Sequence, residues 1–309
     1  MKPDLHIISE SIKTEALRLG FTDCGFSKAE AIPEDAQRLR EWLNNGYHAG
    51  MLYMENHFEK RTDPTKLEEG AKTVISVLLN YYTDRIQSDP EAPILSKYAY
   101  GTDYHFVMKD RLKELYNYID TKFGPVSGRV FVDSAPVMDR AWARKAGLGW
   151  IGKNSNLISR SAGSFVFIGE IVIDLELKYN TSPESDFCGS CSLCIDACPT
   201  NAILPGRTLD AQKCISYQTI ENKEPIDEKI RPALSNRMFG CDICQDVCPW
   251  NRKALIHTIP ELNPSEELMQ MSKSDWAALE KSEHKRLFKS SALKRARFEK
   301  LKGNIESIL

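Results

Sequence analysis

Eight of the nine cysteines in this chain of 309 residues lie between Cys188 and Cys248. The first four follow the spacing C-x2-C-x2-C-x3-C-P and are Cys188, Cys191, Cys194 and Cys198. Three more follow C-x2-C-x3-C-P at Cys241, Cys244 and Cys248, and Cys214 stands alone between the two motifs. In a reducing compartment, such clustered cysteines are metal ligands or redox centres more often than disulfides. The chain must therefore fold around inorganic groups in this region.

The spacing of the first motif is typical of bacterial ferredoxins with two [4Fe–4S] clusters, in which the fourth cysteine of a motif binds the other cluster. Three thiolates on one tight loop reach three irons of a cubane, while the fourth points away along the following helix. This rule assigns the first cluster to Cys188, Cys191, Cys194 and Cys248. It assigns the second to Cys198, Cys214, Cys241 and Cys244, with Cys214 replacing the missing first cysteine of the second motif. The alternative is structural zinc, which uses paired C-x2-C units.

The remaining composition is that of an ordinary globular protein. Hydrophobic residues make up 42% of the chain and charged residues 27%, and the formal net charge is −2. The N-terminal MKPDLHIISE turns polar at once, and no apolar run approaches the roughly 20 residues that a membrane helix needs. We expect a cytoplasmic protein with no membrane partner, and we expect Cys24 to be a buried, inert thiol.

The pattern of apolar residues predicts mixed helices and strands before the cysteines. Helical spacing predicts helices over 8–20, 34–43 and 104–123, the last capped by Thr102 or Asp103, and a further helix from Ser134-Ala135-Pro136 to about Ala146. Strands are expected over 73–79 and 129–133, and a hairpin over 156–160 and 164–173. We therefore predict an α/β or α+β fold with three parts: residues 1–180, a ferredoxin-like part over 181–256, and a helical segment over 257–309.

The last segment is locally basic. Nine lysines and arginines stand against two acids between Lys281 and Lys302. A solvated helix surface and a patch that binds phosphates both explain this composition. Neither a G-x-G-x-x-G motif after a strand nor a Walker A motif occurs, so a dinucleotide or a nucleoside triphosphate is not indicated. Spacing alone thus predicts an iron–sulfur redox protein whose second redox centre is unidentified.

Three further segments carry a resemblance to a known family. They are KYAYGTDYH over 97–105, VDSAPV over 132–137 and AWARKAGLGWIGKN over 141–154. Together with the cysteine motifs, these segments resemble the epoxyqueuosine reductases, and the resemblance extends from Ile8 to about Asn304. The resemblance implies cobalamin bound on the first domain, beside the two clusters. It implies reduction of the epoxide of epoxyqueuosine to the alkene of queuosine at the wobble position of tRNA.

The resemblance also implies roles for individual residues. Asp133 is expected to be the proton donor, with a pKa raised by burial against the corrin; the alternative is a cap of the helix expected to begin near Pro136. Cobalamin is expected to contact Arg61, Ser96, Asp133, Leu157, Ile168, Ser216, Cys241 and Asp242. Asp103, Tyr104 and His105 are expected near cobalamin or substrate, and Lys153 and Asn154 near substrate.

The partners follow from the same resemblance. Lys294, Arg295 and Arg297 are expected to contact the tRNA backbone, and an unidentified donor is expected to supply electrons to a monomer. Many members of the family carry a helical-repeat extension after the region matching Leu293–Asn304, so we expect either a natural short form or a difference in part of the surface that contacts tRNA. The competing hypotheses are an enzyme related to reductive dehalogenases and an iron–sulfur electron carrier without catalytic activity.

Overall fold

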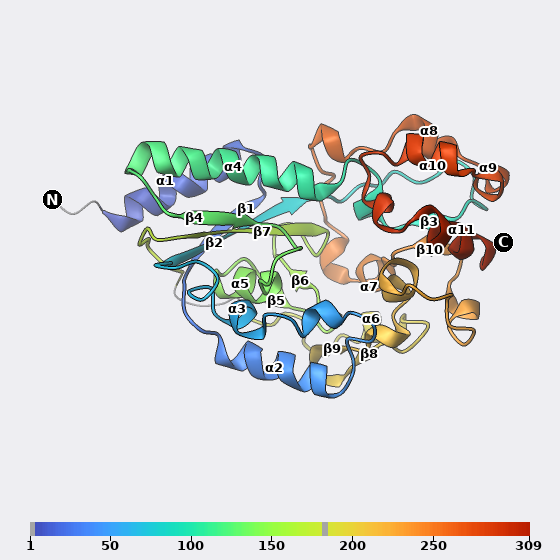
Figure 1. Cartoon of the computed structure of the whole chain (residues 1–309), viewed down its shortest axis with the longest axis horizontal. Helices are drawn as coiled ribbons and strands as arrows, with labels where there is room; N and C mark the ends of the chain where they lie inside the picture. Colours follow the sequence, from blue (N-terminus) through green and yellow to red (C-terminus); the bar gives the residue numbers. More distant parts are fainter. Residues whose placement is uncertain (1–3, 181–184) are drawn as a thin grey trace.

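The computed structural model describes residues 4–180 and 185–309, and its largest sheet lies between two layers of helices (Figure 1). This sheet has the order β1-β2-β7-β4, and each neighbouring pair is antiparallel. Its strands are β1 (Asp23–Lys28), β2 (Thr73–Asn80), β7 (Val166–Ile173) and β4 (Gly128–Phe131). The antiparallel pairing makes the fold α+β, one of the two expected classes. Residues 181–184, at the expected boundary between the first two parts of the chain, lie outside the described residues.

Two long helices, α1 (Leu5–Arg18) and α4 (Tyr104–Phe123), cover one face of the sheet (Figure 1). Both helices are confirmed to within a few residues of their predicted bounds. Leu112 of α4 is fully buried against the sheet core, and Asp103 caps α4 by accepting a hydrogen bond from the amide of His105. Over the described ranges, no helix is both long and apolar enough to cross a membrane.

The opposite face of the sheet packs against α5 (Asp139–Lys145). Trp142 of this helix is buried together with Val74 of β2 and Val172 of β7, whose side chains point away from α1 and α4 because neighbouring residues alternate between faces. The other elements on this side are α2 (Pro33–Asn44), η1 (Leu52–Met54), α3 (Phe58–Thr62), β5 (Trp150–Ile151) and β6 (Leu157–Ile158).

Two local predictions were wrong, and one strand was missed. The expected hairpin does not form, because β6 pairs with β5 while β7 pairs with β2 and β4; only Ser159 and Gly163 form an isolated bridge. The long apolar run of β7 thus occupies the centre of the sheet, where both faces are covered. The helix expected from Ser134 begins only at Asp139, since the residues before it form tight turns. The strand β1 was not expected.

The cysteine-rich region contains short elements that follow the motifs. The helices α6 (Leu193–Asp196) and α7 (Ile243–Asp246) contact each other. A strand from the first part of the chain, β3 (Ile94–Leu95), pairs in parallel with β10 (Arg237–Phe239) directly before Cys241. The remaining short elements are η2 (Lys97–Ala99), β8 (Ile203–Leu204), η3 (Pro205–Arg207), β9 (Thr208–Leu209), η4 (Ala211–Lys213), η5 (Tyr217–Glu221), η6 (Arg231–Ala233) and η7 (Pro249–Asn251).

The C-terminal segment is helical, as predicted, and it also encloses a core. Leu95, Ala99, Phe239, Leu293 and Ile305 belong to one buried apolar cluster, so this core combines residues from all three expected parts. The segment comprises η8 (Pro260–Leu262), α8 (Glu266–Gln270), α9 (Lys273–Ala278), α10 (Lys281–Leu287), η9 (Ala292–Arg295) and α11 (Phe298–Glu306). The last segment is thus an integral part of the structure (Figure 1).

This packing predicts the effect of truncating a side chain in the C-terminal core. Leu293 is fully buried, so Leu293→Ala should lower the free energy of unfolding by about 2–5 kcal/mol through lost burial and the cavity left behind. Leu255 is mostly exposed, and Leu255→Ala is the matched control, with an expected change within about 0.5 kcal/mol. Thermal unfolding under anaerobic conditions compares the two variants. Equal unfolding midpoints would contradict an integral C-terminal core.

Candidate functional site

The eight clustered cysteines form two groups in space. Four of them line one small cavity together with apolar side chains such as Ile203 and Ile243; these are Cys198, Cys214, Cys241 and Cys244. In the other group, burial and then the neighbouring thiols of Cys248, Cys188 and Cys191 raise the pKa of the Cys194 thiol. The spacing of the motifs predicts the same grouping, including the exchange of Cys198 and Cys248 between motifs.

The two groups lie next to each other. Burial raises the pKa of the Cys244 thiol, and the charges of Cys241, Cys214, Asp242 and Cys194 raise it further, in decreasing order. Cys194 belongs to the group of Cys188, Cys191 and Cys248, so the two groups are close enough for their charges to interact. Thiolates are the ligands that iron–sulfur clusters require, and four of them around one apolar cavity suit a cubane. Among the described residues, no group of three or more His, Cys, Asp or Glu side chains is arranged so that it could hold a single metal ion. Cys24 is buried, as expected.

A carboxylate lies at the open end of the sheet, on the turn that follows β4. Asp133 has a left-handed backbone with φ of 52°, and the turn is closed by a hydrogen bond from the amide of Ser134 to the carbonyl of Val132. The buried Val132 anchors this turn, whereas the Asp133 side chain is half exposed. The helix α5 begins at Asp139 behind Met138, which excludes a capping role for Asp133.

Side chains from α4 hold this carboxylate. The hydroxyl of Tyr104 donates to Oδ2 of Asp133 at 2.5 Å, and the Tyr104 ring stacks on Phe167 with the ring centres 4.3 Å apart. His105 lies between two carboxylates, with Nδ1 2.8 Å from Asp103 and Nε2 3.5 Å from Asp133. The resemblance placed Asp103, Tyr104 and His105 near cobalamin or substrate. The structure brings Tyr104 and His105 to Asp133, whereas Asp103 contacts His105.

The charges of this group are set by its contacts. Hydrogen bonds with Asp103 and then Asp133 raise the pKa of His105 to about 9, despite partial burial, so His105 is protonated at neutral pH. Burial alone would raise the pKa of Asp133, but the hydrogen bonds from His105 and Tyr104 and the charges of His105 and Arg295 lower it below its ordinary value. In the protein without its ligands the proton therefore resides on His105, and the raised pKa expected for Asp133 on burial against the corrin stays a prediction.

A second group of side chains, one of them from the cysteine-rich region, lies next to Asp133. Arg295 of η9 lies 3.9 Å from Oδ2 of Asp133, and its other terminal nitrogen lies 2.7 Å from Glu221 of η5. Tyr53 of η1 completes the group, since the charges of Glu221, Arg295 and Asp133 all act on its hydroxyl. Arg295 was expected to contact tRNA phosphates together with Lys294 and Arg297. The structure places Arg295 alone of the three at Asp133.

A pair of carboxyl groups lies deeper, below Asp133. Glu170 is fully buried in the middle of β7, and burial, then the charge of Asp139 and a hydrogen bond with it, raises the pKa of Glu170 well above its ordinary value. Burial and the charge of Asp133 also raise the pKa of Asp139, to about 6. Within the described part of the chain, the Glu170 oxygens have no donor partner. Burial and the neighbouring carboxyl groups therefore favour the protonated, neutral form of Glu170. The lone acid in the apolar run VFIGEIVI was the available sequence signal for it.

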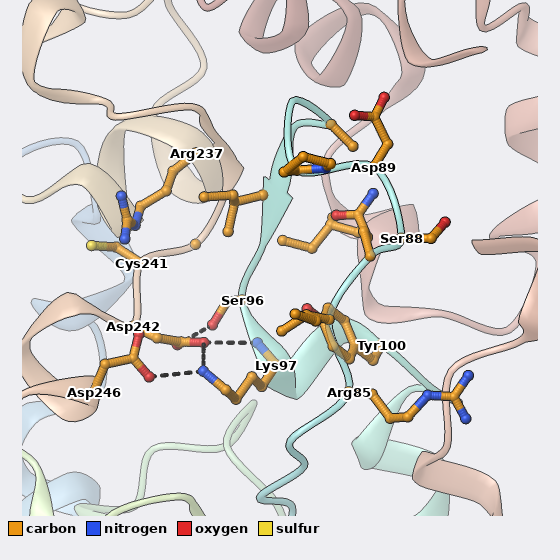
Figure 2. Close-up of a pocket in the computed structure, with 17 residues that line it drawn as sticks. Arg85, Ser88, Asp89, Ser96, Lys97, Tyr100, Arg237, Cys241, Asp242 and Asp246 are labelled. Atoms are coloured by element: carbon orange, nitrogen blue, oxygen red, sulfur yellow. Dashed lines mark hydrogen bonds and ion pairs between the residues drawn. The ribbon is translucent and has the colours of Figure 1, made fainter. Parts of the chain in front are cut away.

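The residues expected around cobalamin fall into two places. Ser96, Cys241 and Asp242 line a cavity of about 470 Å³ next to the second cysteine group (Figure 2). Asp242 is buried there and accepts hydrogen bonds from the hydroxyl of Ser96 and, at 2.8 Å, from the amide of Lys97. The Lys97 ammonium also bonds to Asp246 at 2.7 Å, which closes one wall of the cavity (Figure 2).

The other expected cobalamin residues do not line this cavity. Leu157 and Ile168 belong to the apolar cluster below the sheet, and Ser216 directly precedes η5, which carries Glu221. Arg61 is buried and donates to the carbonyl of Tyr53 at 3.2 Å. Among the described residues nothing pairs with its Nε, so this nitrogen is able to bind a polar group of a ligand.

Lys153 and Asn154, expected near substrate, contact the cysteine loops instead. The Lys153 ammonium donates to the carbonyls of Gly189 and Cys191 at 2.7 and 2.8 Å, and the Asn154 amide donates to the carbonyl of Cys244 at 3.3 Å. These residues therefore fix the loops that carry the thiols.

Comparisons with known proteins agree with this architecture. A family model described as "4Fe-4S double cluster binding domain" matches residues 187–251, and one described as "Epoxyqueuosine reductase QueG, DUF1730" matches residues 61–134. The epoxyqueuosine reductase of Cellulophaga algicola is 51% identical over 96% of this chain and 97% of its own length.

Two solved structures are informative. A crystal structure of epoxyqueuosine reductase with a tyrosine tRNA stem loop carrying epoxyqueuosine superimposes with a TM-score of 0.92 and 29% identity, over 99% of this chain and 82% of that one. A catabolic reductive dehalogenase superimposes with a TM-score of 0.51 and 17% identity, over 82% of this chain and 33% of that one. The second likeness shows a shared fold alone.

The grouping of the thiols predicts the iron content of single variants. The wild type should hold about eight iron atoms, from two four-iron cubanes. Cys214→Ala removes one thiol from the cavity of the second group, so it should lower the content to between about four and seven while leaving the first cluster intact. Cys24→Ala is the control and should keep the wild-type content. Iron analysis of the anaerobically purified proteins measures this content, and an unchanged content in Cys214→Ala would contradict the assignment of Cys214 as a cluster ligand.

The buried carboxyl pair predicts a pH effect on stability. The pKa of Asp139 rises from 3.8 to about 6 on folding, so its contribution to stability is complete below pH 4 and is lost as the pH rises through 6. Asp139→Asn keeps the shape and removes the charge, so its unfolding midpoint should fall less than that of the wild type between pH 5 and 7.5. The exposed Asp110 on α4 provides the control Asp110→Asn, which should follow the wild type. Parallel curves for all three proteins would refute the buried ionisation.

Proposed function

The chain belongs to the epoxyqueuosine reductase family of oxidoreductases, and we propose that it reduces the epoxide of epoxyqueuosine to the alkene of queuosine at the wobble position of tRNA. The observation that carries this proposal is the group around Asp133, where a carboxylate, a phenol and a protonated imidazole converge beside the cysteine-rich region. The relative solved with an epoxyqueuosine-modified tRNA stem loop supports the choice of substrate.

We infer that the eight cysteines hold two [4Fe–4S] clusters and that cobalamin binds next to them. The two groups of four thiols and the match to a double-cluster domain support the clusters. The cavity lined by Ser96, Cys241 and Asp242 and the unpaired Nε of Arg61 offer polar contacts to cobalamin, and Leu157, Ile168, Ser216 and Asp133 would complete its surroundings. When bound, cobalamin reduced through the clusters would supply the electrons for the reaction.

The reaction requires acid groups from the chain. Reduction of an epoxide to an alkene consumes two electrons and two protons and releases water. Negative charge builds on the oxygen as its bond to carbon breaks, so a positioned acid lowers the barrier. Asp133 is half exposed and ionised in the protein without its ligands, so it would hand this oxygen a proton that it first takes from His105. His105, 3.5 Å away and protonated at neutral pH, can return a proton to Asp133.

We propose that the tRNA approaches from the C-terminal side. Lys294 and Arg297 are exposed on the turn that also presents Arg295, and exposed cations of this kind neutralise backbone phosphates. Electrons would arrive from a donor at the loop of Cys188 and Cys191, where Gly189 and Ser190 are exposed. We expect the enzyme to act as a cytoplasmic monomer.

Turnover of a defined substrate tests the function. Protein reconstituted anaerobically with iron, sulfide and cobalamin is supplied with a chemical reductant and a tRNA stem loop carrying epoxyqueuosine, and nucleosides are analysed by mass spectrometry. The wild type should form queuosine. Asp133→Asn should keep the absorption of clusters and corrin but lose at least about 100-fold in rate, the range expected for a lost general acid. Asp110→Asn, an exposed carboxylate on α4, should match the wild type.

The alternatives give different results in the same assay. A wild type that dehalogenates a halogenated aromatic and leaves epoxyqueuosine intact would be a dehalogenase-like enzyme. A wild type with no corrin absorption after reconstitution would be an electron carrier. Full turnover by Asp133→Asn would remove Asp133 as the proton donor.

A further inference from the structure

Arg295 differs from its basic neighbours on the same turn. All three side chains are exposed, but over the described ranges neither Lys294 nor Arg297 takes part in an ion pair of 4 Å or less, whereas Arg295 bridges Glu221 at 2.7 Å and Asp133 at 3.9 Å. A side chain that already neutralises two carboxylates is a poor phosphate ligand, because binding a phosphate would release both of them.

The backbone fixes Arg295 in this place. Leu293 and Ala292 of η9 are buried in the C-terminal core. The Ser291 hydroxyl accepts a hydrogen bond from the Leu293 amide and donates to the carbonyl of Ala99, both at 3.2 Å. The carbonyl of Ser290 accepts a hydrogen bond from the amide of Asp103 at 2.6 Å. The turn that presents Arg295 is thus bonded to the segment that leads into α4.

Glu221 provides the second fixed point. It ends η5, a helical turn that begins three residues after the predicted cluster ligand Cys214. Thr219 of the same turn is fully buried and bonds to the carbonyl of Ile215 at 2.8 Å, so Glu221 is presented from a rigid base. The guanidinium of Arg295 therefore joins the C-terminal turn, the cysteine-rich region and the catalytic carboxylate.

We propose that Arg295, anchored by Glu221, is a positioning residue of the reaction: it orients the Asp133 carboxyl group and balances its charge, and it does not bind the tRNA backbone. This inference rests on the proposed function, because it assigns Arg295 to the acid of that reaction. It also separates Arg295 from Lys294 and Arg297, which keep their expected place on the RNA surface.

Several charged or titratable groups surround Asp133 and influence its protonation. They are Tyr104 and His105 on α4, Asp139 and Arg140 on α5, Glu170 on β7, Tyr53 on η1, Tyr98 on η2, Glu221 on η5 and Arg295 on η9. Of these, Arg295 and Glu221 carry opposite charges, so neutralising Arg295 and neutralising Glu221 should shift the pKa of Asp133 in opposite directions. Loss of the Arg295 charge raises the pKa of Asp133, and loss of the Glu221 charge lowers it.

Single-turnover rates measured against pH test this pair. For an acid that must be protonated, the rate falls as the pH rises through its pKa. Arg295→Gln should lower the plateau rate about tenfold, because Asp133 is less well held, and should move the midpoint of the fall to higher pH. Glu221→Gln should move the same midpoint to lower pH. Arg295→Lys, which keeps the charge, should retain the wild-type midpoint.

The salt dependence of binding separates this role from a phosphate contact. Affinity for the epoxyqueuosine stem loop is measured at several salt concentrations. Lys294→Gln should reduce the slope of log affinity against log salt by about 0.7–0.9, the loss of one phosphate contact, and should leave the pH midpoint unchanged. Arg295→Gln should keep the wild-type slope.

The outcomes are distinct. A reduced salt slope in Arg295→Gln, or midpoints that move in the same direction in Arg295→Gln and Glu221→Gln, would overturn the inference. A wild type that leaves epoxyqueuosine unreduced would instead refute the proposed function, and the salt slopes would still decide whether Arg295 contacts phosphate. Opposite midpoint shifts together with an unchanged slope would establish Arg295 as a positioning residue.

Discussion

The buried carboxylate of Asp242 connects the sheet domain to the cysteine-rich region. It directly follows Cys241 in the chain and accepts hydrogen bonds from the hydroxyl of Ser96 and the amide of Lys97, next to the parallel pairing of β3 with β10. A buried carboxylate is costly unless such donors surround it. Once they are in place, the position of the second thiol group relative to the sheet is fixed. Electron transfer between a cluster and a neighbouring centre depends on this kind of fixed spacing.

The group around Asp133 depends on the same union of distant segments. Tyr104 and His105 come from α4, Glu221 from η5 in the cysteine-rich region and Arg295 from the C-terminal turn. No one of the three expected parts of the chain contains the whole group. The C-terminal core, which joins Leu95, Phe239 and Leu293, therefore serves the chemistry as well as the stability. Positive and negative groups both lie close to the Asp133 carboxylate. Its pKa should therefore change when a bound ligand displaces one of these groups.

The sequence predicted the elements whose signals are local and periodic. The helices α1, α2 and α4, the strand β2 and the pairing of cysteines into two groups follow from apolar spacing, capping and ligand spacing. The partners of β7 did not, because a strand with two covered faces carries no alternation that selects its neighbours. The late start of α5 was missed because a proline near a helix start is also compatible with a turn.

The site was predictable in its chemistry and only partly in its geometry. Asp133, Tyr104 and His105 were expected from the resemblance, but the contact of Arg295 with Asp133 joins residues more than 150 positions apart, and no local pattern encodes it. The basic composition around Arg295 favoured a surface role for the whole run, since composition does not record which exposed side chain pairs with distant carboxylates. Glu170 was visible as an acid in an apolar strand, but its partner Asp139 depends on how α5 packs on the sheet.

The left-handed backbone at Asp133 has a consequence for the residues that this position can accept. A φ of 52° is tolerated by glycine, asparagine and aspartate and is costly for most other side chains. The turn thus narrows the choice to the one short residue type that both accepts this geometry and carries an ionisable group. A longer glutamate would bear backbone strain and displace its carboxyl group, so the turn and the position of the carboxyl group both depend on the same aspartate.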